Sequence, residues 1–142
     1  MDTRRLAAGT LVGGITIWVL GYVIFDVTFA DFYAANVGSA TGVGRDAQLM
    51  WAVVLGSLSY GALIAYAMGN RTATPTVGGG AAVGAVVAFL VWFTVDFILY
   101  GVSNVSNLAR TIVDPVLELV RGGVAGAAIA VVAGKMSSAA RM

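Results

Sequence analysis

The sequence contains no cysteine and no histidine in its 142 residues. These absences exclude disulfide chemistry, haem held by two histidines, metal sites built from histidine and cysteine, and the Ser–His–Asp triad. We therefore predict no metal site, no cofactor and no enzymatic activity. Charged residues make up only 11% of the chain, against about 25% in a soluble domain. The net charge is +1 without any cluster of Lys and Arg, so nucleic acid is not an expected partner.

The chain is instead rich in apolar residues, which make up 59% of it and gather in four long stretches. The hydrocarbon core of a bilayer is about 30 Å thick, and about 20 helical residues cross it. Backbone amides left unpaired in lipid are costly, so such stretches have to be helical. We predict an all-α integral membrane four-helix bundle with up-down topology, a single transmembrane domain over residues 1–142 in contact with the lipid bilayer. The expected spans are about 6–30, 47–69, 76–100 and 115–134.

Capping residues define the expected ends of these spans. Asp46 is a good N-cap for the second helix. Asp114 and Pro115 are expected to be the N-cap and first residue of the fourth helix, because proline inside a helix would break it. Residues 101–110 would then form an external loop. Pro75 suits the start of the third helix.

Basic residues predict the orientation of the bundle. With alternating spans, the side that holds both termini carries most of them: Arg4, Arg5, Arg71, Lys135 and Arg141. The opposite loops carry only Arg45 and Arg110. By the positive-inside rule both termini are expected in the cytoplasm. We predict a multi-pass protein of the cytoplasmic (inner) membrane of a prokaryote.

Small residues recur at every fourth position of two predicted spans, at Gly80 and Gly84 in the third and at Gly122 and Gly126 in the fourth. No hydrophobic force drives helices together in lipid, so close backbone approach through small residues supplies the packing. The pattern fits contacts inside one bundle. It also fits contacts with a second copy or with a larger membrane complex.

The candidate site consists of charged residues within or beside the apolar spans: Asp26, Asp96, Glu118 and Arg121. In the predicted topology all four lie in the outer third of the membrane. Glu118 and Arg121 are three residues apart and can pair on one helix face. A charge at the centre of a span costs at least about 2.5–3.5 kcal/mol, so these side chains should face the interior and find partners. Three carboxylates around one guanidinium leave excess negative charge, which would hold a proton or attract a cation.

Two functions fit this pattern. The first is a protein that binds or transports a cation, a proton or a small solute at an acidic outer pocket. The second is a non-catalytic structural subunit, in which the ion pair only fixes helix order and the glycine faces contact other subunits. A membrane enzyme ranks last, since only isolated carboxylates could act in it.

Tyr100 and Gly101 are the first two residues of the run YGVSNVSNLA. This run resembles the loop Y-G-x-Y-D-L-T-N-L-A of small four-span bacterial membrane proteins of unknown function. In that family the loop also follows the third span. Asn107 matches the family, whereas Asn104 stands where the family has Asp. The family's first-span ending is similar to Phe25–Phe29 with Tyr33 and Gly38. The resemblance implies a four-span architecture and supplies no function, because the family has no settled activity.

Overall fold

The computed structural model of the chain describes residues 2–69 and 76–139, and its regular structure is helical. Its elements in order are α1 (Thr3–Gly21), the π-helix η1 (Tyr22–Thr28), α2 (Ala30–Ala35), α3 (Met50–Gly69), α4 (Val77–Val102) and α5 (Leu108–Ala139). Four stretches are long and apolar enough to cross a membrane: Thr3–Thr28, Met50–Gly69, Val77–Val102 and Leu108–Ser137. The prediction of an all-helical chain with four candidate spans is thereby confirmed.

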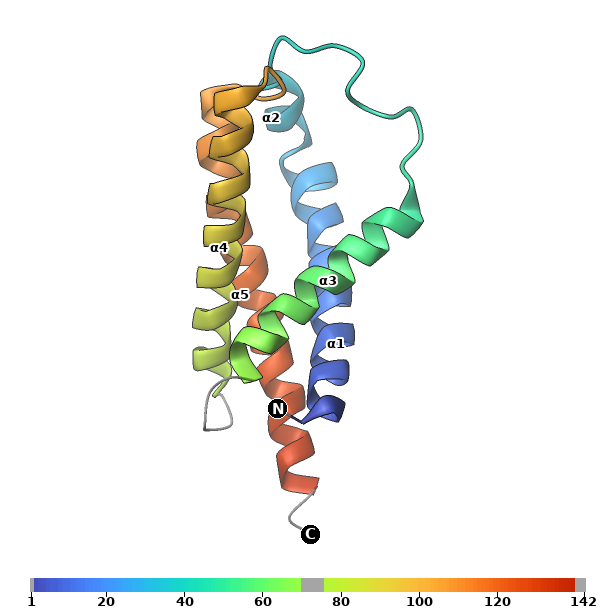
Figure 1. Cartoon of the computed structure of the whole chain (residues 1–142), viewed down its shortest axis with the longest axis vertical. Helices are drawn as coiled ribbons and strands as arrows, with labels where there is room; N and C mark the ends of the chain where they lie inside the picture. Colours follow the sequence, from blue (N-terminus) through green and yellow to red (C-terminus); the bar gives the residue numbers. More distant parts are fainter. Residues whose placement is uncertain (1, 70–75, 140–142) are drawn as a thin grey trace.

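The helices form a bundle in which α4 packs against α5, and α1 packs against both α5 and α3 (Figure 1). The start of α1 and the end of α5 lie at one end of the bundle. The opposite end, called the loop end below, holds α2 and the connections 36–49 and 103–107 (Figure 1). Helix α3 crosses α1 obliquely, so its Met50 end stands away from the other helices.

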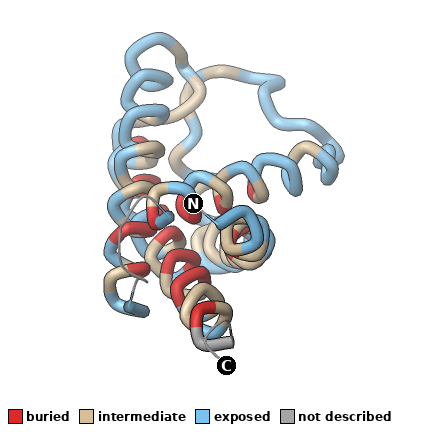
Figure 2. The backbone as a smooth tube through the Cα atoms, turned by 60° about the horizontal axis from the view of Figure 1, so that its bottom comes forward, coloured by how far each residue is buried: buried red, intermediate tan, exposed pale blue. Residues whose placement is uncertain are grey.

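Buried residues lie along the lines where the helices meet, and the outward faces are exposed (Figure 2). The apolar core combines residues from all four spans: Ile17, Ile64, Ala65, Met68, Val83, Ala125, Ile129 and Ala130. Large apolar side chains such as Leu11, Leu55 and Leu90 remain exposed on the outside. An apolar outer face of this kind suits helices that are surrounded by lipid.

Glycine allows the helices to approach one another backbone to backbone. A side chain at Gly84 of α4 would overlap the carbonyl oxygen of Gly122 in α5, and one at Gly80 would overlap that of Gly126. Such contacts supply van der Waals packing where lipid gives no hydrophobic drive between helices. The crossing of α1 and α3 has the same character, at Gly13, Gly14 and Gly61.

The structure corrects the two predicted capping sites. Helix α3 starts at Met50, after the carbonyl of Leu49 accepts the first helical amide bonds, so Asp46 does not cap it. Helix α5 starts at Leu108 instead of Pro115, and residues 101–102 still belong to α4. The first span is also interrupted at Phe29, between η1 and α2. Pro75 lies outside the described residues.

Asn107 explains the early start of α5. Its side-chain oxygen accepts a hydrogen bond from the Arg110 amide at 3.0 Å, and its carbonyl accepts one from the Thr111 amide at 3.1 Å. Asparagine is among the best N-caps, so the helix gains about two turns before Pro115. Pro115 has no amide hydrogen, so the helix loses the hydrogen bond that residue 115 would donate to the Thr111 carbonyl. Membrane helices packed against neighbouring helices tolerate such a loss. The prediction that the fourth helix begins at Pro115 was wrong for this reason.

The adjacent glycines of α5 give a matched test of this packing. We expect Gly122→Ala to lower the free energy of unfolding by about 1–3 kcal/mol, because the new methyl group overlaps the Gly84 carbonyl and the Ala88 side chain. Gly123→Ala should be neutral or stabilising, since its methyl group would make only ordinary contacts at 3.6 Å. Thermal unfolding in detergent measures both. Equal melting temperatures for the two variants would contradict a tight crossing of α4 and α5.

Candidate functional site

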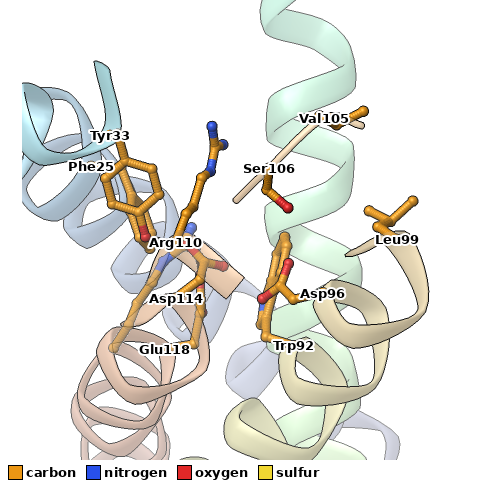
Figure 3. A pocket seen from close by; sticks show the side chains of 11 residues that line it. Phe25, Tyr33, Trp92, Asp96, Leu99, Val105, Ser106, Arg110, Asp114 and Glu118 are labelled. Atoms are coloured by element: carbon orange, nitrogen blue, oxygen red, sulfur yellow. Dashed lines mark hydrogen bonds and ion pairs between the residues drawn. The ribbon is translucent and has the colours of Figure 1, made fainter. Parts of the chain in front are cut away.

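One face of α5 carries four charged side chains near the loop end of the bundle. Arg110, Asp114, Glu118 and Arg121 follow one another at spacings of four, four and three residues, which places them on one side of a helix. This alignment exists because α5 begins at Leu108 and runs through Pro115. Figure 3 shows Arg110, Asp114 and Glu118 on this face, opposite Trp92 and Asp96 of α4.

Glu118 and Arg121 form a buried ion pair at the end of this face that is farther from the loop end. The Glu118 side chain is 1% exposed and accepts a hydrogen bond from Arg121 Nη1 at 2.5 Å. Its second oxygen lies 3.4 Å from the Tyr60 hydroxyl of α3. Arg121 Nε donates to the carbonyl of Ile17 in α1 at 2.9 Å. The pair therefore connects α5 with both α1 and α3.

The first span makes room for the guanidinium group of Arg121. A side chain at Gly21 would overlap that group, and glycine leaves the space open. The π-helix η1 begins at the next residue and places the Phe25 ring 5.4 Å from Arg121 Cζ. A cation at this distance is attracted to the face of an aromatic ring. π-helical turns are rare in proteins, and those that occur are often found at functional sites. The position of η1 beside the ion pair therefore supports a functional role for this region.

A second cluster lies nearer the loop end and centres on Tyr33 of α2. Its hydroxyl donates a hydrogen bond to the carboxylate of Asp114, which is buried. Arg110 lies over the Tyr33 ring, with Cζ 4.9 Å from the ring centroid. Burial, and after it the hydrogen bond to Asp114, raises the pKa of Tyr33 above its ordinary value. The phenol therefore stays protonated and acts as a donor at physiological pH.

Between α4, α5, η1 and α2 these side chains line a half-open cavity of about 300 Å³, called the site cavity below. Asp96 of α4 projects into it toward Asp114 (Figure 3), and the two carboxyl groups interact electrostatically. Among the residues that the structure describes, two buried side-chain polar atoms have no hydrogen-bond partner, Asp96 Oδ2 and Trp92 Nε1. The residues that line the cavity are Phe25, Tyr33, Trp92, Asp96, Leu99, Val105, Ser106, Arg110, Asp114, Glu118 and Arg121.

Three carboxyl groups and two guanidinium groups line the site cavity, so with all of them ionised one negative charge is in excess. Like charges in a poorly hydrated site cannot all stay ionised without a compensating charge. A shared proton or a bound cationic group would supply it. Within residues 2–69 and 76–139, no three acidic side chains are grouped so that they could hold a metal ion. The arrangement suits a proton or an organic cation better than a metal.

The structure brings three of the four predicted site residues together and separates the fourth. Asp96, Glu118 and Arg121 line the site cavity, whereas Asp26 of η1 is exposed and lies in a different cleft, between the first span and α3. Sequence reasoning missed Arg110, which it placed in an external loop, and Asp114, which it placed at the N-cap of the fourth helix. The spacing of four, four and three residues from Arg110 to Arg121 could have revealed them.

The predicted loop motif joins the two connections of the loop end. The side-chain amide of Asn107 donates to Asn36 Oδ1 at 3.0 Å, beyond its role as N-cap. The Gly38 amide donates to the Val105 carbonyl at 3.1 Å, and a side chain at Gly38 would overlap the Asn104 carbonyl. Because Val105 and Ser106 line the site cavity, these contacts hold its wall at the loop end. Tyr100 and Gly101 are exposed in the last turn of α4.

Comparisons of the chain with protein-family models, with curated protein sequences and with solved structures gave no match.

Removal of Arg121 tests whether the ion pair is structurally important. Arg121→Ala leaves the Glu118 carboxylate buried without its partner, so we expect a loss of about 3–5 kcal/mol in unfolding free energy. Arg45→Ala, in an exposed segment, should cost almost nothing. Glu118→Gln added to Arg121→Ala should recover part of the loss, because it removes the uncompensated charge. A double variant no more stable than Arg121→Ala would contradict a buried charge as the cause.

Proposed function

We propose that the protein binds a small organic cation, an amine or a quaternary ammonium ion, in the site cavity and that it catalyses no reaction on it. The observation that carries this proposal is the unpartnered Asp96 oxygen facing Asp114 in a cavity with one negative charge in excess. At about 300 Å³ the cavity lies at the lower end of the range of about 300–1,000 Å³ for ligand sites. It therefore suits a small solute.

The aromatic lining supports the same class of ligand. Phe25, Tyr33 and Trp92 all line the site cavity together with Asp96. Ammonium groups bind favourably to the faces of aromatic rings, and more so where water is excluded. Phe25 and Tyr33 already lie beside Arg121 and Arg110, so Trp92 and Asp96 on α4 are the groups left to contact a cation.

A proton takes the place of the ligand when the cavity is empty. Asp96 is faced by Arg110, Asp114, Glu118 and Arg121 of α5, with Tyr33 of α2 beside Asp114. One proton held in the site cavity neutralises the excess charge. An arriving cation releases this proton, so binding is stronger at higher pH. Coupling of solute to proton would make the protein suitable for transport as well as for binding.

A structural subunit of a membrane assembly is the second candidate. The observation in its favour is the first half of α3, where Met50, Trp51, Val54 and Leu55 are exposed on a helix that stands away from the bundle. A second copy or another subunit could cover this half. The glycines of α4 and α5 are less suited to that role, because they already face one another within the chain.

The resemblance to small four-span bacterial proteins of unknown function supports a common architecture. We propose that the chain is a distant relative of that family. Two of the matching positions have a clear structural role, since Asn107 caps α5 and Gly38 allows the two connections to meet. Such roles depend on the fold and say nothing about the solute.

The decisive comparison is between Asp96→Asn and Asp26→Asn. We expect short alkylamines or tetramethylammonium to stabilise the wild-type protein, by about 2.7 kcal/mol at one hundred times the dissociation constant, and more strongly as pH rises. Asp26→Asn should keep this response, because Asp26 lies outside the site cavity. Asp96→Asn should remain folded and lose it. Thermal unfolding across pH measures all three, and a wild-type protein that no amine stabilises would favour the structural subunit.

We further propose that the loop end faces the outside of a prokaryotic inner membrane and that both termini are cytoplasmic. Support comes from the basic residues, with Arg4, Arg5 and Lys135 near the opposite end against Arg45 and Arg110 near the loop end.

Cysteine labelling tests this orientation directly, because the native chain contains no cysteine. In whole cells, Ser39→Cys in the exposed loop should react with a membrane-impermeant thiol reagent. Thr3→Cys at the start of α1 should react only after the cells are opened. The reverse pattern would invert the orientation.

A further inference from the structure

A second cavity, the lateral cleft, lies between the first span and the first half of α3. Its volume is about 680 Å³, and its walls include Trp18, Tyr22 and Asp26 on one side and Met50, Val53 and Ser57 on the other. Tyr22 and Met50 are 63% and 45% exposed, so the cleft opens at the side of the bundle. It exists because α3 contacts α1 closely at Gly61 and diverges from it toward Met50.

The site cavity and the lateral cleft share two lining residues, Phe25 and Arg121. Phe25 belongs to η1 and Arg121 to α5, and the guanidinium carbon lies 5.4 Å from the ring centroid. The two side chains therefore stand together as the wall between the two spaces.

This wall is held by contacts that can be broken one at a time. Arg121 bonds to Glu118 on its own helix and to the Ile17 carbonyl of α1, and both bonds are made by the end of a long, flexible side chain. Phe25 has no polar side-chain atom, so its ring is held only by packing, edge to face against Tyr33 at 5.2 Å and beside Arg121. Glu118 lines the site cavity, so a cation that enters the cavity competes with Arg121 for its carboxylate.

The loop end is more rigid than this wall. There the backbone bonds from Gly38 to Val105 and from Ala40 to Asn104, together with the Asn36–Asn107 bond, join the two connections. Several backbone bonds would have to break together to widen this end. Rotation of two side chains is enough to open the wall.

We propose that Phe25 and Arg121 form a gate, through which the solute cavity communicates sideways with the lateral cleft. This inference rests on the proposed function and adds its route: the cation crosses between the site cavity and the side of the bundle when Arg121 leaves Glu118. Gly21 is part of the gate, because the absence of a side chain there leaves the space that the Arg121 guanidinium group occupies when the gate is closed.

Single cysteines in proteoliposomes test the gate without any bound solute. The probe is a cationic, membrane-impermeant methanethiosulfonate reagent applied from the loop side. Ser106→Cys reports on the site cavity, Val53→Cys on the lateral cleft, and Leu55→Cys on an exposed face of α3 outside the cleft. With the gate intact, we expect Ser106→Cys to react and Val53→Cys to stay unreactive.

Two further substitutions then open the gate in different ways. Gly21→Ala displaces the guanidinium by a methyl group and keeps every charge, whereas Phe25→Ala removes the other half of the wall. In both backgrounds Val53→Cys should become reactive toward the cationic reagent, and Leu55→Cys should stay as it was.

Three results would overturn the gate. In the first, Val53→Cys already reacts while the gate is intact, so that no wall exists. In the second, it stays unreactive in both opened backgrounds while Ser106→Cys still reacts. In the third, its reactivity rises only together with that of Leu55→Cys, which would show general loosening of the bundle. Failure of the gate would leave the Asp96-dependent stabilisation by amines unchanged, so the two proposals fail separately.

Discussion

The buried ion pair of Glu118 and Arg121 is the interaction on which the arrangement of three helices depends. Removing two charges from water is expensive, and the pair is tolerable only when its remaining donors and acceptors are also satisfied. Those partners come from outside α5, as the Ile17 carbonyl of α1 and the Tyr60 hydroxyl of α3. The positions of α1 and α3 are therefore tied to one point of α5. Because Gly21 has no side chain, the guanidinium group of Arg121 has room to reach the Ile17 carbonyl of α1.

Charge and aromatic groups alternate along the same side of the molecule, and this links the fold to the proposed binding. Arg110 lies over Tyr33, whose ring contacts Phe25 edge to face at 5.2 Å, and Phe25 lies beside Arg121. Both guanidinium groups thus have aromatic neighbours as well as carboxylates nearby. Asp96, which comes from the other helix, completes the set without a partner for one of its oxygens. The excess negative charge of the site cavity is a result of how α4 docks on α5.

Glycine determines both where the helices touch and where they separate. Backbone contacts at Gly80, Gly84, Gly122 and Gly126 hold α4 and α5 together below the site cavity. The contact of Gly61 with Gly13 and Gly14 brings α3 to α1, and beyond it the start of α3 diverges. Close approach at small residues is the main source of packing that lipid permits. The lateral cleft is the space left beyond this crossing, where α3 diverges from the first span.

The sequence by itself determined the helical class and the four candidate spans, because long apolar stretches in lipid have no other way to satisfy their backbone amides. It also identified Asp96, Glu118 and Arg121, since charges in apolar stretches need partners. Only the tertiary structure decided the rest. Asp114 joined the site because Asn107 caps α5 early and the helix continues through Pro115, and local propensity rules disfavour this proline inside a helix. Asp26 was left outside because Ile17, Gly21 and Phe25 are the residues of the first span that meet Arg121 of α5, and Asp26 lies instead in the cleft beside α3.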